Sequence, residues 1–384
     1  MELKKHQKEA VKKLNDILDK HKLAYLFGLP RVGKSLIALE SFKNYKSVLI
    51  LTKKNAIESW IKYENLYKNY KVINYEKVKK EDPNDYEAVV IDEAHNFATT
   101  PRPSLRIKET KKFCKNKVIL LLSGTPIVES ALKIYPQFSL SSYSPFNNFK
   151  NFYDFFRFYG IPSPTYLAGR VIESYTKAKD NLLQDIEKYI VKVTYEDANF
   201  NYNNKDFLIK IKAPTPWHNI FKGIKNNNFL GEYPLENVSA VYQALHQYEG
   251  GTYKDKIFKI KPKIEWLVNF AKENCNKKIA VMSYFVNEQR YLRDLRLSNV
   301  DVYSSTKNCE GVDLSHYDLF VLYSFGYSGS KFIQLRDRIV NIEKSLETHC
   351  IIPLIEGGIG ETIYDCVSNK KDFNSNIFKK EFYG

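Results

Sequence analysis

The sequence predicts an α/β protein with two lobes, each built on a parallel β-sheet that helices cover on both faces. Three observations support this class. Short apolar runs alternate with helical patterns through the first 130 residues, the alternation stops near residue 140, and it resumes near residue 256. Strands that are apolar throughout and joined by helices favour a parallel sheet buried on both faces. We therefore expect a first lobe at 1–140, a mostly helical insertion at 141–255 and a second lobe at 256–384.

The first lobe contains four predicted strands. Each is short, rich in aliphatic or aromatic residues, and followed by a polar or glycine-containing turn. These strands are residues 23–27, 47–52, 88–91 and 118–122. Helices are expected between them at 34–44 and 55–67.

The insertion and the second lobe follow from the same patterns. Residues 146–158 are crowded with Phe and Tyr, and the Asn-rich segments 199–204 and 226–228 favour loops. The α/β alternation then returns. The expected helices are 264–273 and 287–295, and the expected strands are 278–283, 319–323 and 350–355.

The composition favours a folded, basic protein. The chain has 384 residues, 43% of them hydrophobic, and a formal charge of +15, which points to a polyanionic partner. The alternative is that a chain rich in Lys and Asn is basic because its gene is AT-rich. No signal peptide is expected at the N-terminus, and the longest aliphatic runs are too short to cross a bilayer. We therefore expect no membrane partner.

The five cysteines are widely spaced and form no CxxC pair, so neither a zinc site nor a disulfide framework is indicated. Reduced thiols in the cytoplasm are the simplest interpretation.

A glycine-rich segment follows the first predicted strand. Residues 28–35 are GLPRVGKS, which fits the phosphate-loop pattern GxxxxGK[ST] between a strand and a helix. In this pattern backbone N–H groups turn toward phosphate oxygens, Lys34 reaches the β- and γ-phosphates, and the Ser35 hydroxyl is a ligand of Mg²⁺. The alternative is a chance glycine-rich turn. We expect the nucleotide to be bound by Gly28, Arg31, Gly33, Lys34 and Ser35.

Two adjacent acids follow the strand predicted at 88–91. Asp92 and Glu93, in the tetrapeptide Asp-Glu-Ala-His, stand where a Walker B carboxylate belongs. Alone they could be ordinary turn residues. Beside a phosphate loop, Asp92 can hold Mg²⁺ through its water shell, and Glu93 can polarise the attacking water. The two motifs together predict hydrolysis of a nucleoside triphosphate with Mg²⁺ as cofactor.

With other motifs in the same order, this tetrapeptide resembles motif II of superfamily 2 helicases and translocases. The sequence looks most like the Swi/Snf-type DNA translocases, in a small form like those of viruses and phages. Residues 3–7 (LKKHQ) are similar to the family's N-terminal motif, whose glutamine, Gln7 here, reads adenine. Other segments resemble the remaining motifs in order: 59–60 (Ia), 73–76 (Ib), 123–127 (III), 281–284 (IV), 310–314 (V) and 334–338 (VI), with 263–267 similar to the helix that opens the second lobe.

The resemblance implies two RecA-like P-loop lobes that share one ATP. In the first lobe Lys34, Asp92 and Glu93 are the expected catalytic residues. Gln334 and Arg338 are expected to join them from the second lobe, with Arg338 stabilising charge on the γ-phosphoryl group.

The resemblance also implies residues that couple ATP to nucleic acid: His95, Ser123, Thr125, Gly311 and Asp313. Each has a simpler alternative, because Ser123 could belong to an ordinary turn and His95 could be a satisfied strand-end histidine. Trp60 and Trp266 are most simply core anchors. Candidate contacts to nucleic-acid phosphates are lysines 77, 79, 80, 108, 111 and 112 and the lysine run 254–263.

Two features depart from the family pattern. The stretch from Ser283 to Cys309 is short, which suggests that a strand of the second lobe is missing. The second arginine of motif VI is replaced by Asn341. Because of this replacement, an alternative function remains: a nucleic-acid clamp that binds ATP as a switch but hydrolyses it poorly.

The function expected from the sequence is therefore a monomeric, nucleic-acid-stimulated ATPase that translocates on duplex DNA or unwinds it, with further protein partners left open. DNA is favoured over RNA as its partner, and an RNA helicase of the same superfamily is the first alternative. A P-loop kinase or GTPase is disfavoured, because neither predicts motifs III, V and VI in a second α/β lobe.

Overall fold

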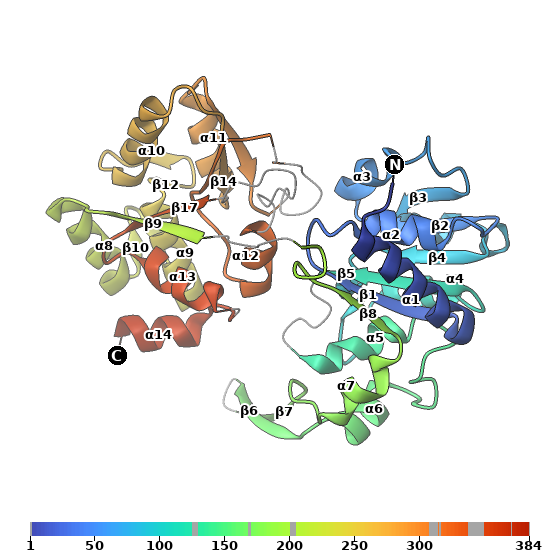
Figure 1. Ribbon diagram of the computed structural model, residues 1–384. Coiled ribbons are helices and arrows are strands. Elements are labelled where there is room, and N and C mark those ends of the chain that lie inside the picture. Colours follow the sequence, from blue (N-terminus) through green and yellow to red (C-terminus); the bar gives the residue numbers. More distant parts are fainter. Residues whose placement is uncertain are drawn as a thin grey trace. The chain divides into compact units, whose positions relative to one another are not determined.

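The computed structural model describes residues 2–124, 130–167, 170–199, 205–306, 314, 316–336, 349–369 and 371–383 (Figure 1). The chain forms two compact units, 1–202 and 203–384. The segment 141–255, predicted as an insertion, is divided between these units, because it contains an edge strand of each sheet.

Unit 1 is built on a six-stranded sheet in the order β3-β2-β4-β5-β1-β8. All its strand pairs are parallel. The strands are β1 (Leu23–Gly28), β2 (Val48–Thr52), β3 (Tyr70–Asn74), β4 (Ala88–Ile91), β5 (Val118–Ser123) and β8 (Ile190–Val193), and a separate antiparallel hairpin comprises β6 (Ser163–Leu167) and β7 (Arg170–Ser174).

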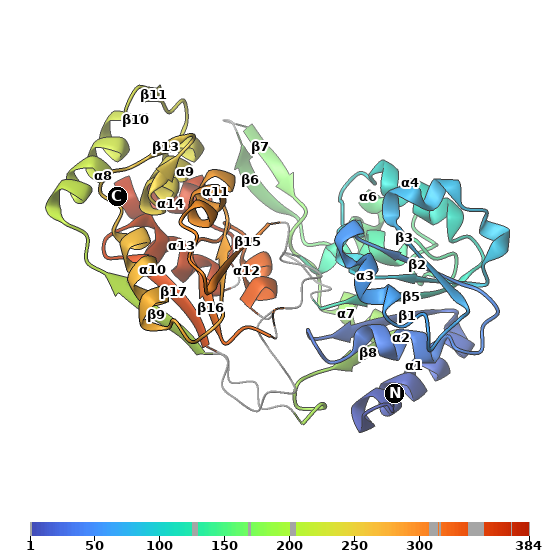
Figure 2. The ribbon, with the colours of Figure 1, turned by 90° about the horizontal axis from the view of Figure 1, so that it is seen from above.

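Helices cover both faces of this sheet, as predicted. The helices of unit 1 are α1 (Lys5–His21), α2 (Lys34–Ser41), α3 (Ile57–Ile61), α4 (Leu105–Phe113), α5 (Ile134–Phe138), α6 (Phe152–Tyr159) and α7 (Asn181–Glu187), with short 3₁₀ helices η1 (Lys54–Ala56), η2 (Tyr75–Lys80), η3 (Pro83–Asp85), η4 (Ala94–Phe97) and η5 (Ala131–Lys133). Figure 2 shows α1 and α2 on one side of the sheet and α4 and α6 on the other.

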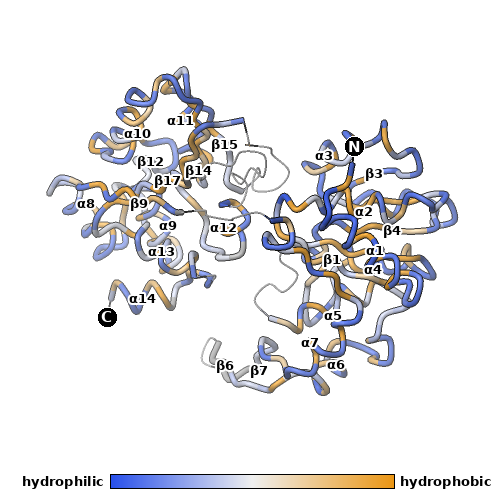
Figure 3. The backbone as a smooth tube through the Cα atoms, in the orientation of Figure 1, coloured by the Kyte–Doolittle hydropathy of each residue, from blue (hydrophilic) through white to orange (hydrophobic). Residues whose placement is uncertain are grey.

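Alternate residues of each strand pack on opposite faces of the sheet, because side chains in a strand alternate in direction. Leu26 and Leu122 join the core beneath α1 and α2, whereas Tyr25 and Leu121 join the core beneath α4 and α6. This double burial explains why the strands are apolar throughout. Figure 3 shows hydrophobic segments along these strands.

Unit 2 is built on a second parallel sheet, in the order β15-β14-β16-β17-β9. Its strands are β9 (Lys205–Ile211), β14 (Ile279–Ser283), β15 (Val300–Ser304), β16 (Leu319–Leu322) and β17 (His349–Ile355). Unit 2 also contains two small antiparallel hairpins. One consists of β10 (Phe229–Leu230) and β11 (Tyr233–Pro234), and the other of β12 (Thr252–Tyr253) and β13 (Lys256–Ile257). The expectation that a strand is missing between 283 and 309 was wrong, because β15 lies there and pairs with β14 along five residues.

The second sheet also carries helices on both faces. They are α8 (Thr215–Asn227), α9 (Val238–Glu249), α10 (Pro262–Glu273), α11 (Val286–Asp294), α12 (Gly329–Arg336), α13 (Ile359–Ser368) and α14 (Ser375–Tyr383). Side chains of α10 and α11 pack in one core cluster, and those of α8, α9, α12 and α13 pack in the other. The prediction of an α/β fold with parallel sheets flanked by helices is thus confirmed. Among the described helices, none is long and apolar enough to cross a membrane.

Candidate nucleotide-binding site

The phosphate loop joins the end of β1 to the start of α2 in unit 1. Gly33 caps α2 with a φ of 89°, in the left-handed region that glycine adopts at little cost. A Cβ at Gly33 would collide with the Gln7 side chain, and a Cβ at Gly28 would lie 2.7 Å from Lys34 Cγ. Arg31 also has a positive φ, of 67°. The loop therefore needs small residues at both ends and has the curvature of an anion cradle.

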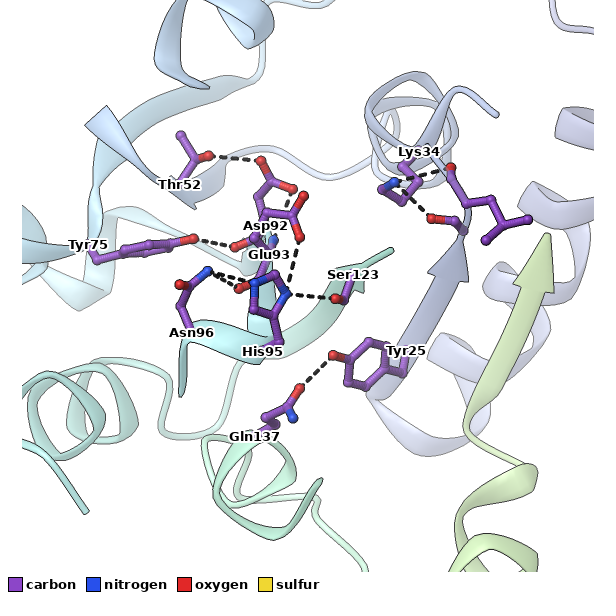
Figure 4. A network of polar contacts seen from close by, with 12 residues as sticks. Tyr25, Lys34, Thr52, Tyr75, Asp92, Glu93, His95, Asn96, Ser123 and Gln137 are labelled. Carbon is purple, nitrogen blue, oxygen red and sulfur yellow. Dashed lines mark hydrogen bonds and ion pairs between the residues drawn. The ribbon is translucent and has the colours of Figure 1, made fainter. Parts of the chain in front are cut away.

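Lys34 lies within the curve of this loop. Its Nζ donates to the carbonyl oxygens of Gly28, at 2.8 Å, and Leu29, at 3.2 Å (Figure 4). The ammonium group therefore stands at the mouth of the cradle, close to where phosphates would lie. Ser35, half-buried, occupies the first turn of α2. This arrangement fits a bound nucleotide.

Gln7 is buried against the same loop. Its Oε1 accepts from the Lys4 backbone N–H at 2.9 Å, and its Nε2 donates to the Val32 carbonyl at 3.4 Å. The His6 Nε2 lies 3.1 Å from the same carbonyl. The structure therefore gives Gln7 contacts to the loop backbone, and its contact with adenine stays a prediction.

Asp92 follows β4 and makes three side-chain hydrogen bonds. Its Oδ2 accepts from Thr52 Oγ1 at 2.8 Å and from Trp60 Nε1 at 3.0 Å, and its Oδ1 accepts from the Glu93 N–H at 3.0 Å. Burial raises the pKa of the Asp92 carboxyl, and the Glu93 charge adds to this, whereas Trp60, Thr52 and Lys34 oppose it. A buried, oriented carboxylate beside a second acid is suited to a divalent cation.

Glu93 and His95 connect the acids to the end of β5. Glu93 has a left-handed backbone, with a φ of 47°, and its Oε2 lies 3.2 Å from His95 Nδ1. The same His95 nitrogen lies 2.9 Å from Ser123 Oγ. Asn96 Nδ2 donates to the Glu93 carbonyl at 2.7 Å and holds the turn (Figure 4).

Gly124, which follows Ser123 at the end of β5, lies close to the phosphate loop. A Cβ at Gly124 would lie 3.5 Å from the Gly28 carbonyl oxygen and 3.7 Å from Lys34 Nζ. Because β1, β4 and β5 are parallel neighbours, their carboxyl ends meet at one edge of the sheet, where ligands of such sheets bind. The structure thus brings together Lys34, Asp92, Glu93, His95 and Ser123.

Several contact residues at this edge were not predicted from the sequence. Thr52 ends β2 and lies beside Asp92, because Leu51 pairs with Ile91. Tyr25 OH donates to Gln137 Oε1 at 2.5 Å below the site, and burial, then the Glu93 charge, raise the Tyr25 pKa well above its ordinary value. Trp60 and Tyr75, which both donate to Asp92, lay within segments that resemble motifs Ia and Ib. Those segments were the available signal.

The predicted residues of unit 2 are only partly described. Gln334 lies on α12, and so does Arg336, whose Nη1 pairs with Asp206 Oδ2 at 3.2 Å. Tyr364 OH donates to the same oxygen at 2.8 Å. Five residues singled out in the sequence lie outside the described residues: Thr125, Gly311, Asp313, Arg338 and Asn341.

The candidate phosphate-contacting lysines differ in exposure. Those at 77, 79, 80, 108, 111 and 112 are exposed on η2 and α4. Lys263, in contrast, is 1% exposed, and its Nζ lies 3.7 Å from Glu249 Oε1 inside unit 2. Its assignment to a nucleic-acid surface was wrong, because the ammonium group is committed to a buried carboxylate.

Part of this site lies within a segment that matches a known protein family. Residues 43–210 match the SNF2-related domain. The match covers less than half of the chain and includes Asp92, Glu93, His95 and Ser123, whereas the phosphate loop precedes it. The matched segment and the phosphate loop before it together contain the predicted residues that the structure brings together in unit 1.

No curated protein matches the chain. Among solved structures, the Sulfolobus solfataricus SWI2/SNF2 ATPase core in complex with dsDNA is 14% identical, with a TM-score of 0.45, covering 100% of this chain and 95% of that one. The Pyrococcus furiosus Hef helicase domain is 13% identical, with a TM-score of 0.49, covering 93% and 96% respectively.

Proposed function

We propose that this protein is an ATP-dependent nucleic-acid motor of the superfamily 2, Swi/Snf type that moves on or remodels duplex DNA. The observation that carries the proposal is the meeting of the phosphate loop, the Asp92–Glu93 pair and Ser123 at the carboxyl edge of one parallel sheet. A phosphate cradle alone would serve a binding protein. Here the cradle lies beside two acids, and His95 joins Glu93 to Ser123 at the end of β5. This arrangement fits nucleotide hydrolysis that is coupled to a change elsewhere in the protein.

The residues of unit 1 would divide the work of binding and hydrolysis. Lys34 would exchange the carbonyl oxygens of Gly28 and Leu29 for phosphate oxygens, since these are stronger acceptors for an ammonium group. Glu93 would accept hydrogen bonds from the attacking water and orient it. Ser35 and Asp92 would hold Mg²⁺, which when bound neutralises charge on the phosphates. Gln7 would contact adenine.

Coupling to nucleic acid would run through His95 and Ser123. The His95 ring contacts both Glu93 and Ser123, so a shift of the loop after β5 changes the surroundings of Glu93. We extend this role to Thr125, Gly311 and Asp313 by resemblance. In unit 2, Gln334 and Arg338 would complete the catalytic set, with Arg338 stabilising charge on the γ-phosphoryl group.

The exposed lysines of η2 and α4 would contact the phosphate backbone of the nucleic acid. A chain with a charge of +15 gains such contacts without reading base sequence. DNA is the proposed partner because SNF2-type motors act on duplex DNA. We propose that the protein acts as a monomer in the cytoplasm.

The test compares ATP hydrolysis with no nucleic acid, single-stranded DNA, duplex DNA and RNA, with triplex displacement on duplex DNA as the assay of movement. We expect duplex DNA to stimulate hydrolysis most and to support ATP-dependent displacement. Preferential stimulation by RNA would identify an RNA helicase. ATP-dependent binding without turnover would identify a clamp. Binding should also weaken linearly with the logarithm of the salt concentration, with little dependence on DNA sequence.

A further inference from the structure

Two different segments of unit 1 each donate a hydrogen bond to Asp92. Trp60, in α3 after β2, donates its indole N–H to Asp92 Oδ2 at 3.0 Å. Tyr75, the first residue of η2 after β3, donates its hydroxyl to the Asp92 backbone carbonyl at 2.5 Å. Figure 4 shows that Thr52, at the end of β2, and Tyr75, which follows β3, both reach Asp92. The side chain and the backbone of one acid are therefore held from two directions.

Trp60 is held through both its ring and its backbone. Its side chain is fully buried, yet its only polar atom is directed at the carboxylate. Tyr70 in β3 donates to the Trp60 carbonyl at 2.7 Å and so fixes the backbone of α3 as well. A buried indole N–H usually has a hydrogen-bond partner, and a charged partner gives a stronger hydrogen bond than a neutral one, so this contact fixes the Trp60 ring and the Asp92 carboxylate relative to each other.

The hydrogen bonds decide which carboxylate oxygen can face a cation. Oδ2 accepts two hydrogen bonds, from Thr52 and Trp60, and both of its lone-pair directions are occupied. Within the part of the chain that the structure describes, Oδ1 accepts one hydrogen bond, from the Glu93 N–H, which leaves its second lone-pair direction for another ligand. Loss of the indole donor would release the constraint on Oδ2 and permit the carboxylate to rotate.

Tyr75 connects the same acid to a basic surface. Its ring packs edge-on against Phe97, with centroids 5.1 Å apart, and the Arg106 guanidinium lies 5.4 Å from its centroid. Arg106 of α4 pairs with Glu76 of η2 at 2.5 Å. The lysines exposed on these two elements are 77, 79, 80, 108, 111 and 112. A ligand that draws η2 and α4 together therefore acts on the ring that holds Asp92.

We propose that Trp60 and Tyr75 are positioning residues that orient Asp92 toward Mg²⁺ and transmit nucleic-acid binding at η2 and α4 to this acid. The inference rests on the proposed function and adds residues that the phosphate-loop and acid motifs do not contain. Neither residue touches the nucleotide in this assignment. Both act through Asp92.

The first test measures how much Mg²⁺ the full chain needs to bind a fluorescent ATP analogue. Trp60→Phe keeps the aromatic ring and removes only the indole donor. We expect the half-saturating Mg²⁺ concentration to rise about tenfold, as for loss of one hydrogen bond to a charged group. Binding of the analogue in EDTA should stay within about twofold of the unsubstituted protein, because no contact to the nucleotide is lost. A purely structural defect would weaken both.

The matched control is Trp217→Phe. Trp217 is also fully buried, and its Nε1 has no hydrogen-bond partner in the part of the chain that the structure describes. Thr52→Val removes the second donor to Oδ2 with little change of shape and should raise the Mg²⁺ requirement as Trp60→Phe does. Thermal melting shows whether each variant is folded. If Trp60→Phe is unfolded, the Mg²⁺ requirement of Thr52→Val decides whether the hydrogen bonds to Asp92 Oδ2 orient this acid toward Mg²⁺. A Mg²⁺ requirement equal to that of Trp217→Phe in the folded variants overturns the inference.

The second test repeats the Mg²⁺ titration with saturating duplex DNA and adds Tyr75→Phe. We expect duplex DNA to lower the Mg²⁺ requirement of the unsubstituted protein by at least about threefold and to lose this effect in Tyr75→Phe. A full DNA effect in Tyr75→Phe overturns the transmission. The proposed function fails separately, if the unsubstituted protein binds the analogue but neither hydrolyses ATP nor responds to nucleic acid.

Discussion

The Lys34 ammonium group donates to the Gly28 carbonyl at 2.8 Å, so the phosphate loop closes on its own lysine. Gly28 opens the motif and Lys34 is its penultimate residue, so this hydrogen bond spans nearly the whole loop. A bound nucleotide would have to replace this hydrogen bond with one to phosphate. The exchange is favourable, because a phosphate oxygen carries charge and a carbonyl oxygen does not.

Replacement of Lys34 should therefore impair binding itself. In Lys34→Ala we expect affinity for Mg-ATP to fall by about tenfold or more and stimulated hydrolysis to disappear, since a charge on the phosphates is lost. Isothermal titration with a non-hydrolysable ATP analogue measures the first effect and phosphate release the second. Lys46→Ala, an exposed lysine beyond α2, is the control. Normal ATP turnover by Lys34→Ala would contradict the proposal that residues 28–35 bind the phosphates of ATP.

Replacement of Glu93 should separate binding from hydrolysis. Glu93→Gln keeps the shape of the side chain but cannot accept a proton from water, so ATP should bind and remain unhydrolysed. We expect turnover to fall by at least about a hundredfold with nucleotide affinity within about threefold. Single-turnover measurements with bound ATP test this. Glu58→Gln, an exposed acid on α3, should behave as the unsubstituted protein.

The contact between His95 and Ser123 predicts a defect in coupling. Ser123→Ala removes the hydroxyl that lies 2.9 Å from His95 Nδ1 and leaves the histidine with Glu93. We expect duplex DNA to stimulate hydrolysis several-fold less in this variant, with a smaller effect on the rate without DNA. The measurement is the ratio of the two rates. An unchanged ratio would show that the contact is structural only.

The sheets illustrate what the sequence could predict. β1, β2, β4 and β5 were predicted within one or two residues, because strands buried on both faces are apolar throughout. β3, by contrast, was missed. It is an edge strand with mostly half-exposed residues, so its pattern is weak. β8 was also missed, because it pairs with β1 from more than 160 residues away and nothing local indicates that pairing.

The site shows the same division. Lys34, Asp92 and Glu93 stand in contiguous motifs that carry their chemistry in the sequence itself. Thr52 and Tyr75 reach Asp92 only through the pairing of β2 with β4 and β3, and Lys263 was misassigned because charge says nothing about burial. Contacts that depend on strand register need the structure.

Unit 2 contains a buried acid that predicts a pH dependence of stability. Glu288 is fully buried, and its carboxylate accepts from Ser283 Oγ at 2.5 Å and from Ser324 Oγ. Burial raises the pKa of Glu288 to about 7, although the two hydroxyls and Lys263 oppose this. The folded protein therefore holds a proton that the unfolded chain releases near pH 4.5.

The sign follows from this difference. The contribution of Glu288 to the free energy of unfolding is fully present below about pH 4.5 and is lost as pH rises through about 7, a total of about 3 kcal/mol. Glu288→Gln cannot ionise, so its stability should match the parent near pH 5 and exceed it at pH 8. Denaturant unfolding followed by tryptophan fluorescence measures this.

His246, a second buried group, also makes the stability depend on pH, so the parent must be compared with Glu288→Gln at each pH. Burial lowers the pKa of His246 to about 3, which favours stability at higher pH and opposes the Glu288 effect between about pH 4.5 and 6.5. The difference between the parent and Glu288→Gln at each pH removes the His246 contribution. A difference that does not change between pH 5 and 8 would contradict the prediction.

The last prediction separates two arginines of motif VI. Arg336 lies on α12 and pairs with Asp206 of β9, a carboxylate only 8% exposed that also accepts from Tyr364. This pair secures the helix to the sheet within unit 2. Arg336→Ala should therefore lower the stability of unit 2 by about 1–3 kcal/mol, because it leaves a largely buried acid without its charge partner. The remaining folded protein should still hydrolyse ATP.

Arg338 is the proposed partner of the γ-phosphoryl group, and Asn341 stands where the family pattern has a second arginine. Asparagine can donate a hydrogen bond but carries no charge, so the site would rely on Arg338. We expect Arg338→Ala to reduce hydrolysis by at least about a hundredfold with unchanged stability, and Asn341→Arg to leave the rate unchanged or raise it. Rates measured beside Arg336→Ala at matched folded fractions distinguish loss of chemistry from loss of fold. If folded Arg338→Ala hydrolyses ATP as fast as the parent, unit 2 does not supply the catalytic arginine from this position.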